Sequence, residues 1–260
     1  MLLRPETFAT APFVDATPWR RDPPRLLELA RELGYLYLRD FLPAGHVAAV
    51  RAFARSFCEQ HGWLHPDPEG SPHFAAVPGA QLAGRGWDDP RFVALQRELR
   101  LLPAFQDLAQ DPDLLAILEW VVGEPVWLAT ANYCWLKFPG SPEQTTLPHQ
   151  DLFYLPDTPR LWTAWAPLTD TPMDLGPLGV VPGSQRQGLW PHVDAMTGIS
   201  VAPEVIWHTG PVRSGDVVLF DALAVHCAWS NVSPTMARAS LDIRYEPRPS
   251  EGGTPLRPLA

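Results

Sequence analysis

The second half of the chain is a series of short apolar runs separated by turn residues. From residue 125 onward, clusters of Pro, Gly, Asp and Ser interrupt stretches rich in Val, Trp, Tyr, Phe and Leu. The runs are VWLATANYCWLKF (126–138), TTLPHQDLFYL (145–155), RLWTAWAPL (160–168), GPLGVVPGS (176–184), DVVLFDAL (216–223) and RASLDIRYEP (238–247). Several short strands with turn signals between them are typical of a sandwich or barrel, and not of βαβ units. The pattern therefore predicts a β-sandwich core over about residues 125–247.

The first half is mainly helical by its periodicity. In 43–62, the apolar residues Val47, Val50, Phe53 and Phe57 recur at helical spacing. The predicted elements are helices over 23–33, 43–62, 91–100 and 112–122, a strand over 34–42, and a Pro- and Gly-rich loop or lid over 64–90. We therefore expect an α+β fold in which a helical part, about 1–124, packs on the β core to form a single domain over 1–260.

Composition limits the partners of this chain. The net charge is −9, which argues against nucleic acid and anionic membranes as partners. No segment reaches the roughly 18 apolar residues of a membrane span, and residues 1–20 contain no sustained apolar stretch of the kind found in secretory signals. Three widely spaced cysteines form no disulfide framework. We expect a cytoplasmic protein that acts on a small molecule; the sequence leaves its oligomeric state open.

A histidine and an aspartate stand two residues apart in an apolar run. In a strand, the side chains of His149 and Asp151 would point to the same face and could converge on one point. The chain has eight histidines, so a match of this kind can also arise by chance. Alone, the pair is more typical of a hydrogen-bonded histidine and a turn aspartate than of a metal site.

A second histidine follows a predicted buried strand. His226 comes three residues after the run 216–223 and could meet the first pair if the two segments face each other. Two histidines and one carboxylate on one side of a metal leave three positions open, as in non-haem Fe(II) oxygenases. Catalytic zinc sites accept the same ligands, so the triad alone does not identify the metal.

Two arginines in the last β-run point to an anionic cosubstrate. Arg238 and Arg244 share a face of the predicted strand 238–247, and a buried guanidinium needs an anionic partner. A 2-oxo dicarboxylate could supply one carboxylate to an arginine and chelate iron with its other end. A zinc hydrolase would not explain such an arginine.

Six segments, in order, resemble the phytanoyl-CoA dioxygenase family of Fe(II)/2-oxoglutarate oxygenases. They are LKFPG (136–140), PHQD (148–151), LWTAWAPLTD (161–170), GPLGVVPGSQRQG (176–188), SGDVVLFDALAVH (214–226) and RASLDIRYEP (238–247). The stretch GYLYLRDFL (34–42) with the helix after it resembles the family's N-terminal opening, and the similarity thins over 64–124. The resemblance implies a double-stranded β-helix core, of the jelly-roll or cupin-like kind, with N-terminal helices packed on it.

The resemblance also implies a role for particular residues. His149, Asp151 and His226 match the family's iron ligands, and Arg238 matches its 2-oxoglutarate anchor. Three further positions are expected at the cosubstrate: Trp165 lines it, and Tyr133 and Lys137 lie on the strand before the iron motif and reach the site.

The chain departs from the family pattern at three places. Arg238 lies twelve residues after His226, where the family usually has eleven. A one-residue slip would turn Arg238 outward unless the loop absorbs it, which makes Arg244 the fallback anchor. Ala228 and Leu175 replace a serine and an asparagine that are common in the family.

By this resemblance the cofactors are Fe(II), 2-oxoglutarate and O2, and the reaction releases succinate and CO2 while hydroxylating an unactivated C–H bond. Because Asp151 keeps the carboxylate that related halogenases lack, we expect no halogenation. The alternative is a non-catalytic jelly-roll protein that binds a metal or ligand. His192, His208 and the loop histidines His61, His65 and His73 are weaker candidates for substrate contacts, and Cys227 should point away from the metal. The substrate itself cannot be named from the sequence.

Overall fold

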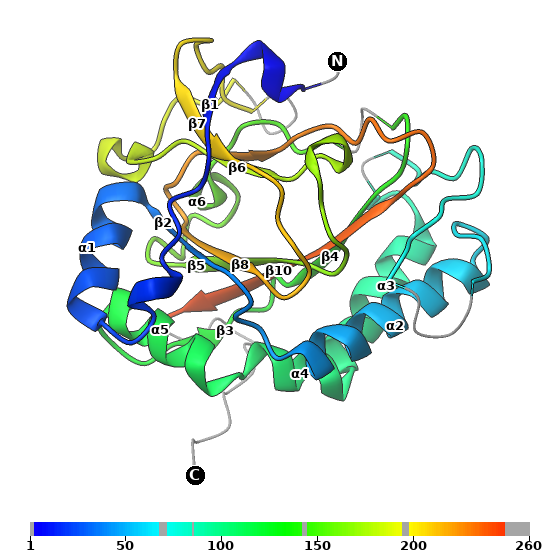
Figure 1. Cartoon of the computed structure of the whole chain (residues 1–260), viewed down its shortest axis with the longest axis horizontal. Helices are drawn as coiled ribbons and strands as arrows, with labels where there is room; N and C mark the ends of the chain where they lie inside the picture. The colour runs from blue at the N-terminus through cyan, green and yellow to red at the C-terminus, as the bar shows by residue number, and fades with distance from the viewer. Residues whose placement is uncertain (1–2, 68–71, 85, 142–144, 194–197, 248–260) are drawn as a thin grey trace.

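The computed structural model describes residues 3–67, 72–84, 86–141, 145–193 and 198–247 (Figure 1). The strands are β1 (Ala9–Ala11), β2 (Tyr35–Leu38), β3 (Trp127–Leu128), β4 (Tyr133–Lys137), β5 (Trp162–Pro167), β6 (Leu178–Val180), β7 (Ile206–Thr209), β8 (Val217–Asp221), β9 (His226–Ala228) and β10 (Arg238–Glu246). The α-helices are α1 (Pro23–Leu33), α2 (Ala44–Gln60), α3 (Pro90–Leu101), α4 (Pro103–Ala109), α5 (Pro112–Val122) and α6 (Asp151–Tyr154). Short 3-10 turns occur at η1 (Pro5–Thr7), η2 (Thr17–Trp19), η4 (Met173–Leu175) and η5 (Ser184–Gln187).

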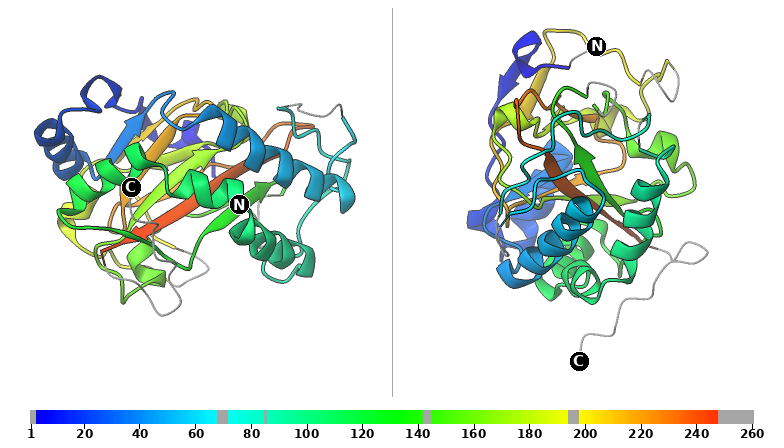
Figure 2. Two further views of the ribbon diagram at one scale, coloured as in Figure 1. Left: turned by 90° about the horizontal axis from the view of Figure 1, so that it is seen from below. Right: turned by 90° about the vertical axis from the view of Figure 1, so that its right-hand side faces the viewer.

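The strands form two sheets that face each other. In the part of the chain that the structure describes, the larger sheet has the order β2-β8-β5-β10-β3, and β4 also pairs with β10. The smaller sheet has the order β1-β7-β6-β9. Helices α1 to α5 lie against the outer side of the larger sheet, away from the smaller one (Figures 1 and 2). This arrangement leaves the space between the sheets for a site.

Alternate residues of the larger sheet point to opposite sides. Tyr35, Trp165 and Phe220 point toward the smaller sheet and pack with its residues Leu178 and Val180. Their neighbours in the chain belong to the core beneath the helices, and these include Leu36, Ala164 and Leu219. Because both faces are covered, strands such as β8 are apolar along nearly their whole length.

Three of the helices begin at an aspartate followed by proline. The carboxylates of Asp22, Asp89 and Asp111 accept backbone N–H groups in the first turns of α1, α3 and α5. Proline in the first turn loses no hydrogen bond there, because those N–H groups have no partner within the helix. Helix α1 ends at Gly34, whose φ of 76° is the left-handed conformation that glycine adopts without strain.

The N-terminal part contributes strands to both sheets. β2, predicted from the alternation in 34–42, pairs antiparallel with β8 at the edge of the larger sheet. β1 pairs in parallel with β7 in the smaller sheet. This mixing supports the expectation of one folding unit, which a single cooperative unfolding transition would test. None of the described helices is long and apolar enough to cross a membrane.

The prediction of a strand over 145–155 is wrong. Within it, His149 forms one isolated bridge with His226, and Asp151–Tyr154 form the one-turn helix α6. Pro148, directly before His149, has no N–H to donate to a strand ladder. Four elements were not predicted from the sequence: α4, β1, β7 and β9. The three strands among them have only three or four residues each. The predicted loop 64–90 contains isolated bridges in its described part and ends at Pro90, the first residue of α3; residues 68–71 and 85 lie outside the described residues.

Candidate metal centre

Three buried side chains from two segments converge between the sheets. His149 and His226 exchange two backbone hydrogen bonds of 2.9 Å, which hold the segment before α6 against the start of β9. Oδ1 of Asp151 lies 3.6 Å from Nε2 of His149 and 3.8 Å from Nε2 of His226. One potential ligand atom from each of the three residues falls within 4.8 Å of the others. This spacing would allow all three atoms to bind a single metal ion.

Each histidine is oriented by a backbone carbonyl two residues earlier. Nδ1 of His149 donates to the carbonyl of Leu147 at 2.8 Å, and Nδ1 of His226 donates to that of Ala224 at 3.0 Å. This bonding fixes the tautomer and leaves Nε2 of both rings as the lone-pair nitrogen that faces Asp151. Burial, and then the neighbouring His149, lower the pKa of His226 to about 3, so its ring is neutral at physiological pH. Neutral imidazole is the form that binds a metal.

The other oxygen of Asp151 is held by the protein. Oδ2 accepts from the Thr163 hydroxyl at 2.7 Å and from Nε of Arg244 at 3.0 Å. Burial would raise the pKa of Asp151, but Arg244 and the two histidines outweigh it and hold that pKa well below its usual range. Asp151 is therefore a carboxylate, which completes a donor set of two imidazoles and one carboxylate on one side of the ion. Such a set fits Fe(II) and leaves three positions open.

Arg238 points into the space between the sheets. The guanidinium is 1% exposed, and it donates from Nη1 to the carbonyl of Gly176 at 2.7 Å and from Nη2 to Ser240 Oγ at 3.1 Å. Its Nε has no hydrogen-bond partner among the described residues. Burial lowers the pKa of Arg238 to about 10, so it remains charged at neutral pH. A buried cation with a free N–H needs an acceptor, as a cosubstrate carboxylate would provide. The twelve-residue spacing has not turned it outward.

Arg244, the fallback anchor, is occupied elsewhere. Each of its three nitrogens already has an acceptor: Nε and Nη2 bond to Asp151, Nη2 also to Asp242 at 3.2 Å, and Nη1 to the carbonyl of Ala131 at 2.7 Å. Its guanidinium also lies 5.3 Å from the Tyr133 ring centre. This arginine therefore serves the metal carboxylate, and Arg238 is the better candidate for a cosubstrate.

A cavity of about 40 Å³ joins the metal residues to Arg238. It is lined by Trp135, Thr146, His149, Trp165, Leu178, Phe220, His226, Cys227, Ala228, Arg238, Asp242 and Arg244. Trp165 thus lines it as expected, with the Arg238 guanidinium 5.7 Å from its ring centre. Tyr133 and Lys137 are not among the lining residues. Lys137 reaches the cavity indirectly, through a 3.1 Å hydrogen bond to Thr146.

Two of the weaker candidates, His192 and His208, are hydrogen-bonded within the protein. His192 uses both ring nitrogens, toward the carbonyl of Trp190 and the N–H of Gln150, and stacks on Phe153 with ring centres 4.0 Å apart. His208 bonds to the buried Tyr35 hydroxyl at 2.6 Å. The Cys227 side chain packs with Trp207 and Trp229 in a separate apolar cluster, as alternation predicted, although Cys227 is also among the residues that line the cavity.

Sequence reasoning missed Gln150, which stands between the two ligands of the H-x-D pair. Its fully buried amide donates to the carbonyls of Gly188 at 2.9 Å and Leu223 at 2.6 Å, and accepts the N–H of Trp190 at 2.7 Å. These bonds tie the segment 188–192 to the metal residues. The available signal was its place between the two predicted ligands, because a side chain between two that face the metal points to the opposite side.

Replacing Gln150 by leucine should destabilise this wall of the site. The change removes three hydrogen bonds and leaves two partly buried carbonyls and one partly buried N–H without this partner, so we expect the free energy of unfolding to fall by about 2–4 kcal/mol. Urea unfolding would measure it. Gln187→Leu, at an exposed glutamine in η5, is the matched control and should change stability by less than about 0.5 kcal/mol. Equal unfolding midpoints for the two variants would contradict the role given to Gln150.

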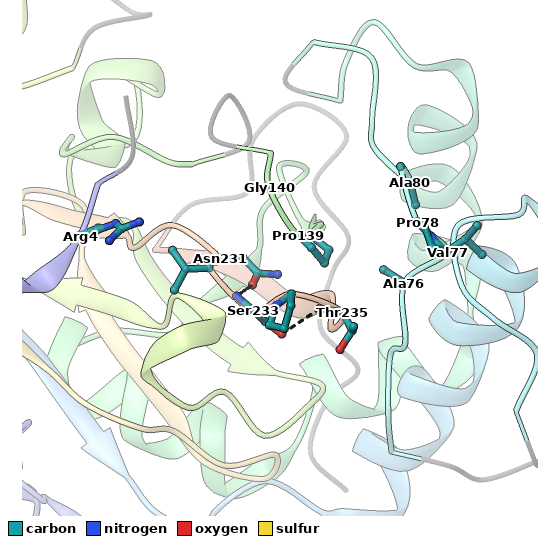
Figure 3. Close-up of a pocket in the computed structure, with 13 residues that line it drawn as sticks. Arg4, Ala76, Val77, Pro78, Ala80, Pro139, Gly140, Asn231, Ser233 and Thr235 are labelled. Atoms are coloured by element: carbon teal, nitrogen blue, oxygen red, sulfur yellow. Dashed lines mark hydrogen bonds between the residues drawn. The ribbon is translucent and has the colours of Figure 1, made fainter.

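A larger hollow of about 540 Å³ lies elsewhere, between residues 76–80, Pro139 and Gly140, and the loop 231–235 (Figure 3). It shares no lining residue with the cavity at the metal centre. Asn231 and Ser233 turn back to hydrogen-bond the N–H groups of their own loop, Ser233 and Thr235, at 2.9 and 3.5 Å (Figure 3). Arg4 is the one charged side chain among its lining residues. The hollow therefore offers little chemistry of its own.

Comparison with known proteins agrees with the geometry. Residues 30–239 match the phytanoyl-CoA dioxygenase (PhyH) family. The 1-deoxypentalenic acid 11-beta-hydroxylase of Streptomyces arenae is 30% identical over 266 residues, covering 93% of this chain and 87% of that protein. The crystal structure of the non-heme alpha ketoglutarate dependent epimerase SnoN from nogalamycin biosynthesis is 26% identical, with a TM-score of 0.60, covering 87% of this chain and 83% of that one.

A second structure of SnoN contains Fe3+, alpha ketoglutarate and nogalamycin RO; it is 25% identical, with a TM-score of 0.61, and covers 87% of this chain and 84% of that one. The α+β jelly-roll fold is thereby confirmed, and with it the expected cofactors, Fe(II), 2-oxoglutarate and O2. The chain belongs to the phytanoyl-CoA dioxygenase family and is an Fe(II)/2-oxoglutarate-dependent dioxygenase.

Proposed function

We propose that the enzyme hydroxylates an unactivated C–H bond of a small biosynthetic molecule, converting 2-oxoglutarate and O2 to succinate and CO2. One oxygen atom enters the new hydroxyl group and the other enters succinate. The observation that carries the proposal is a buried cavity with a 2-His-1-carboxylate set on one side and the cation Arg238 on the other. The relative that hydroxylates 1-deoxypentalenic acid supports a small organic substrate.

Each residue has a defined task in this proposal. His149 and His226 would hold the iron through Nε2, and Asp151 would hold it through Oδ1. Arg238 takes the distal carboxylate of 2-oxoglutarate, for which its free Nε is available. The rings of Trp165 and Phe220 form dry walls around the cavity. When bound, iron supplies the oxidative chemistry, and the protein orients the substrate and excludes water.

The intact constellation separates this proposal from a non-catalytic jelly-roll protein. A ligand-binding protein has no need of three metal donors together with a buried arginine that keeps an unused N–H. Zinc hydrolysis would leave Arg238 without a task. Asp151 also fills the position that a halide would need, so the product should carry oxygen and not halogen.

The test is a substrate screen read out by succinate. Purified enzyme with Fe(II), 2-oxoglutarate and O2 would be offered small terpenoid and polyketide acids, and succinate would be quantified against an Asp151→Ala control. A true substrate should raise succinate in the wild type alone and yield a product heavier by one oxygen atom, labelled when the gas is 18O2. Equal succinate from both proteins, or a chlorinated product made in chloride, would contradict the proposal.

A further inference from the structure

The local backbone does not determine how Asp151 presents its carboxylate. Asp151 is the first residue of α6, a single turn of four residues, and the preceding Gln150 provides no side-chain cap. It does not belong to a strand, so no ladder fixes its direction. The orientation of the carboxylate must therefore come from side chains that contact it.

Two donors on neighbouring strands of the larger sheet make that contact. Thr163 of β5 and Arg244 of β10 are directly opposite each other in the strand register, and this cross-strand pair is called the rung. Both are buried, and both bond to Oδ2 of Asp151, at 2.7 Å from the hydroxyl and 3.0 Å from Nε. Arg244 adds a longer contact of 3.3 Å from Nη2 to Oδ1. Oδ2 is thus saturated with hydrogen bonds, while Oδ1 faces the two imidazoles.

Further hydrogen bonds hold Arg244 in its position. Arg244 is fixed by the carbonyl of Ala131 and by Asp242, whose Oδ2 also accepts the indole N–H of Trp135 at 2.6 Å. Asp242 thus gives the Arg244 guanidinium a second carboxyl acceptor. The sheet and these contacts therefore set the donors to Asp151 in place.

We propose that Thr163 and Arg244 are positioning residues that restrict Asp151 to binding the metal through Oδ1 alone. A carboxylate that chelated iron through both oxygens would occupy one of the three remaining positions. With Oδ2 held by the rung, two positions are kept for 2-oxoglutarate and one for O2. The inference rests on the proposed function, because it takes Asp151 as a metal ligand.

Co(II) is a suitable probe, since it is stable in air and its visible d–d absorption reports coordination number. Thr163→Val removes the hydroxyl and keeps the β-branched shape, and Thr163→Ser keeps the hydroxyl. Partners of metal ligands typically contribute 10- to 100-fold to metal affinity. We expect Thr163→Val to bind Co(II) about 10-fold or more weakly with an altered d–d spectrum, and Thr163→Ser to stay within about 3-fold of the wild type.

Thr169→Val is the matched control. Thr169 is also buried, but its hydroxyl has no hydrogen-bond partner among the described residues, so its removal should leave Co(II) affinity unchanged. Arg244→Lys is the second variant; it keeps the positive charge but loses the planar guanidinium that contacts both oxygens of Asp151. We expect it to weaken Co(II) binding as much as Thr163→Val does. Thermal unfolding of the metal-free proteins identifies the folded variants.

The outcomes distinguish this inference from the proposed function. A folded Thr163→Val or Arg244→Lys with wild-type Co(II) affinity and spectrum would overturn the positioning role. Wild-type protein that binds no Co(II), or binds it as well after Asp151→Ala, would instead overturn the metal site on which the proposed function depends.

Discussion

Replacing Asp151 by alanine should reduce succinate formation by at least about 1,000-fold. The change removes one of three proposed metal ligands, and loss of the metal removes the chemistry that the protein cannot supply itself. It also leaves Arg244 without its main carboxylate partner. Succinate release with a confirmed substrate, measured beside bound iron per chain, would show whether activity and metal are lost together.

A folding defect must be separated from loss of the metal in this experiment. Breaking a buried ion pair can destabilise a protein by about 3–5 kcal/mol, although Asp242 still faces Arg244 here. Asp151→Asn keeps an acceptor for Thr163 and should fold while losing activity. Asp157→Ala, at an exposed aspartate six residues later, should behave as the wild type. An Asp151→Asn enzyme with wild-type turnover and iron content would contradict the assignment of this ligand.

Replacing Arg238 by glutamine should raise the KM for 2-oxoglutarate by about 100-fold or more. Charge-assisted hydrogen bonds to a carboxylate contribute about 1.5–3 kcal/mol each, and each 1.4 kcal/mol corresponds to a tenfold change in affinity. The metal ligands are unchanged, so Co(II) affinity should remain as in the wild type. Steady-state kinetics at varied 2-oxoglutarate, together with the Co(II) titration, would measure both effects.

A cosubstrate analogue sharpens this test. A 2-oxo acid that lacks the distal carboxylate, such as 2-oxobutyrate, gains nothing from Arg238. The wild type should strongly prefer 2-oxoglutarate, and Arg238→Gln should lose most of that preference. Arg97→Gln, at an exposed arginine of α3, should keep it. Full retention of the preference in Arg238→Gln would show that another residue recognises the distal carboxylate.

Much of the fold was predictable because local pattern and burial agree. The Asp-Pro starts of α1, α3 and α5 and the apolar run of β8 each follow from the residues themselves. The very short strands could not be predicted in this way. β1 and β9 have three residues each, which is too few to show an alternation of apolar and polar residues. Their pairing is decided by the partner strands, which lie far away in the sequence.

The structure brings His149, Asp151 and His226 together as the sequence predicted, but through a different local structure. His149 and Asp151 converge as expected, yet through a bridge and a one-turn helix and not along a strand. The roles of Thr163 and Arg244 could not be derived from the sequence. Their joint contact with Asp151 depends on the register of β5 against β10, which sets two residues far apart in the chain opposite each other. The choice of Arg238 over Arg244 depends on the same register.

The most direct measurement is an anaerobic titration of the Fe(II)-loaded protein with 2-oxoglutarate, followed by visible absorption. A 2-oxo acid that chelates Fe(II) through its carboxylate and keto oxygen gives a weak metal-to-ligand charge-transfer band. The wild type should develop this band saturably, Arg238→Gln only at much higher 2-oxoglutarate, and Asp151→Ala should not develop it. Absence of the band from iron-loaded wild-type protein, or an equal band in Asp151→Ala, would contradict a 2-oxoglutarate-binding iron centre at His149, Asp151 and His226.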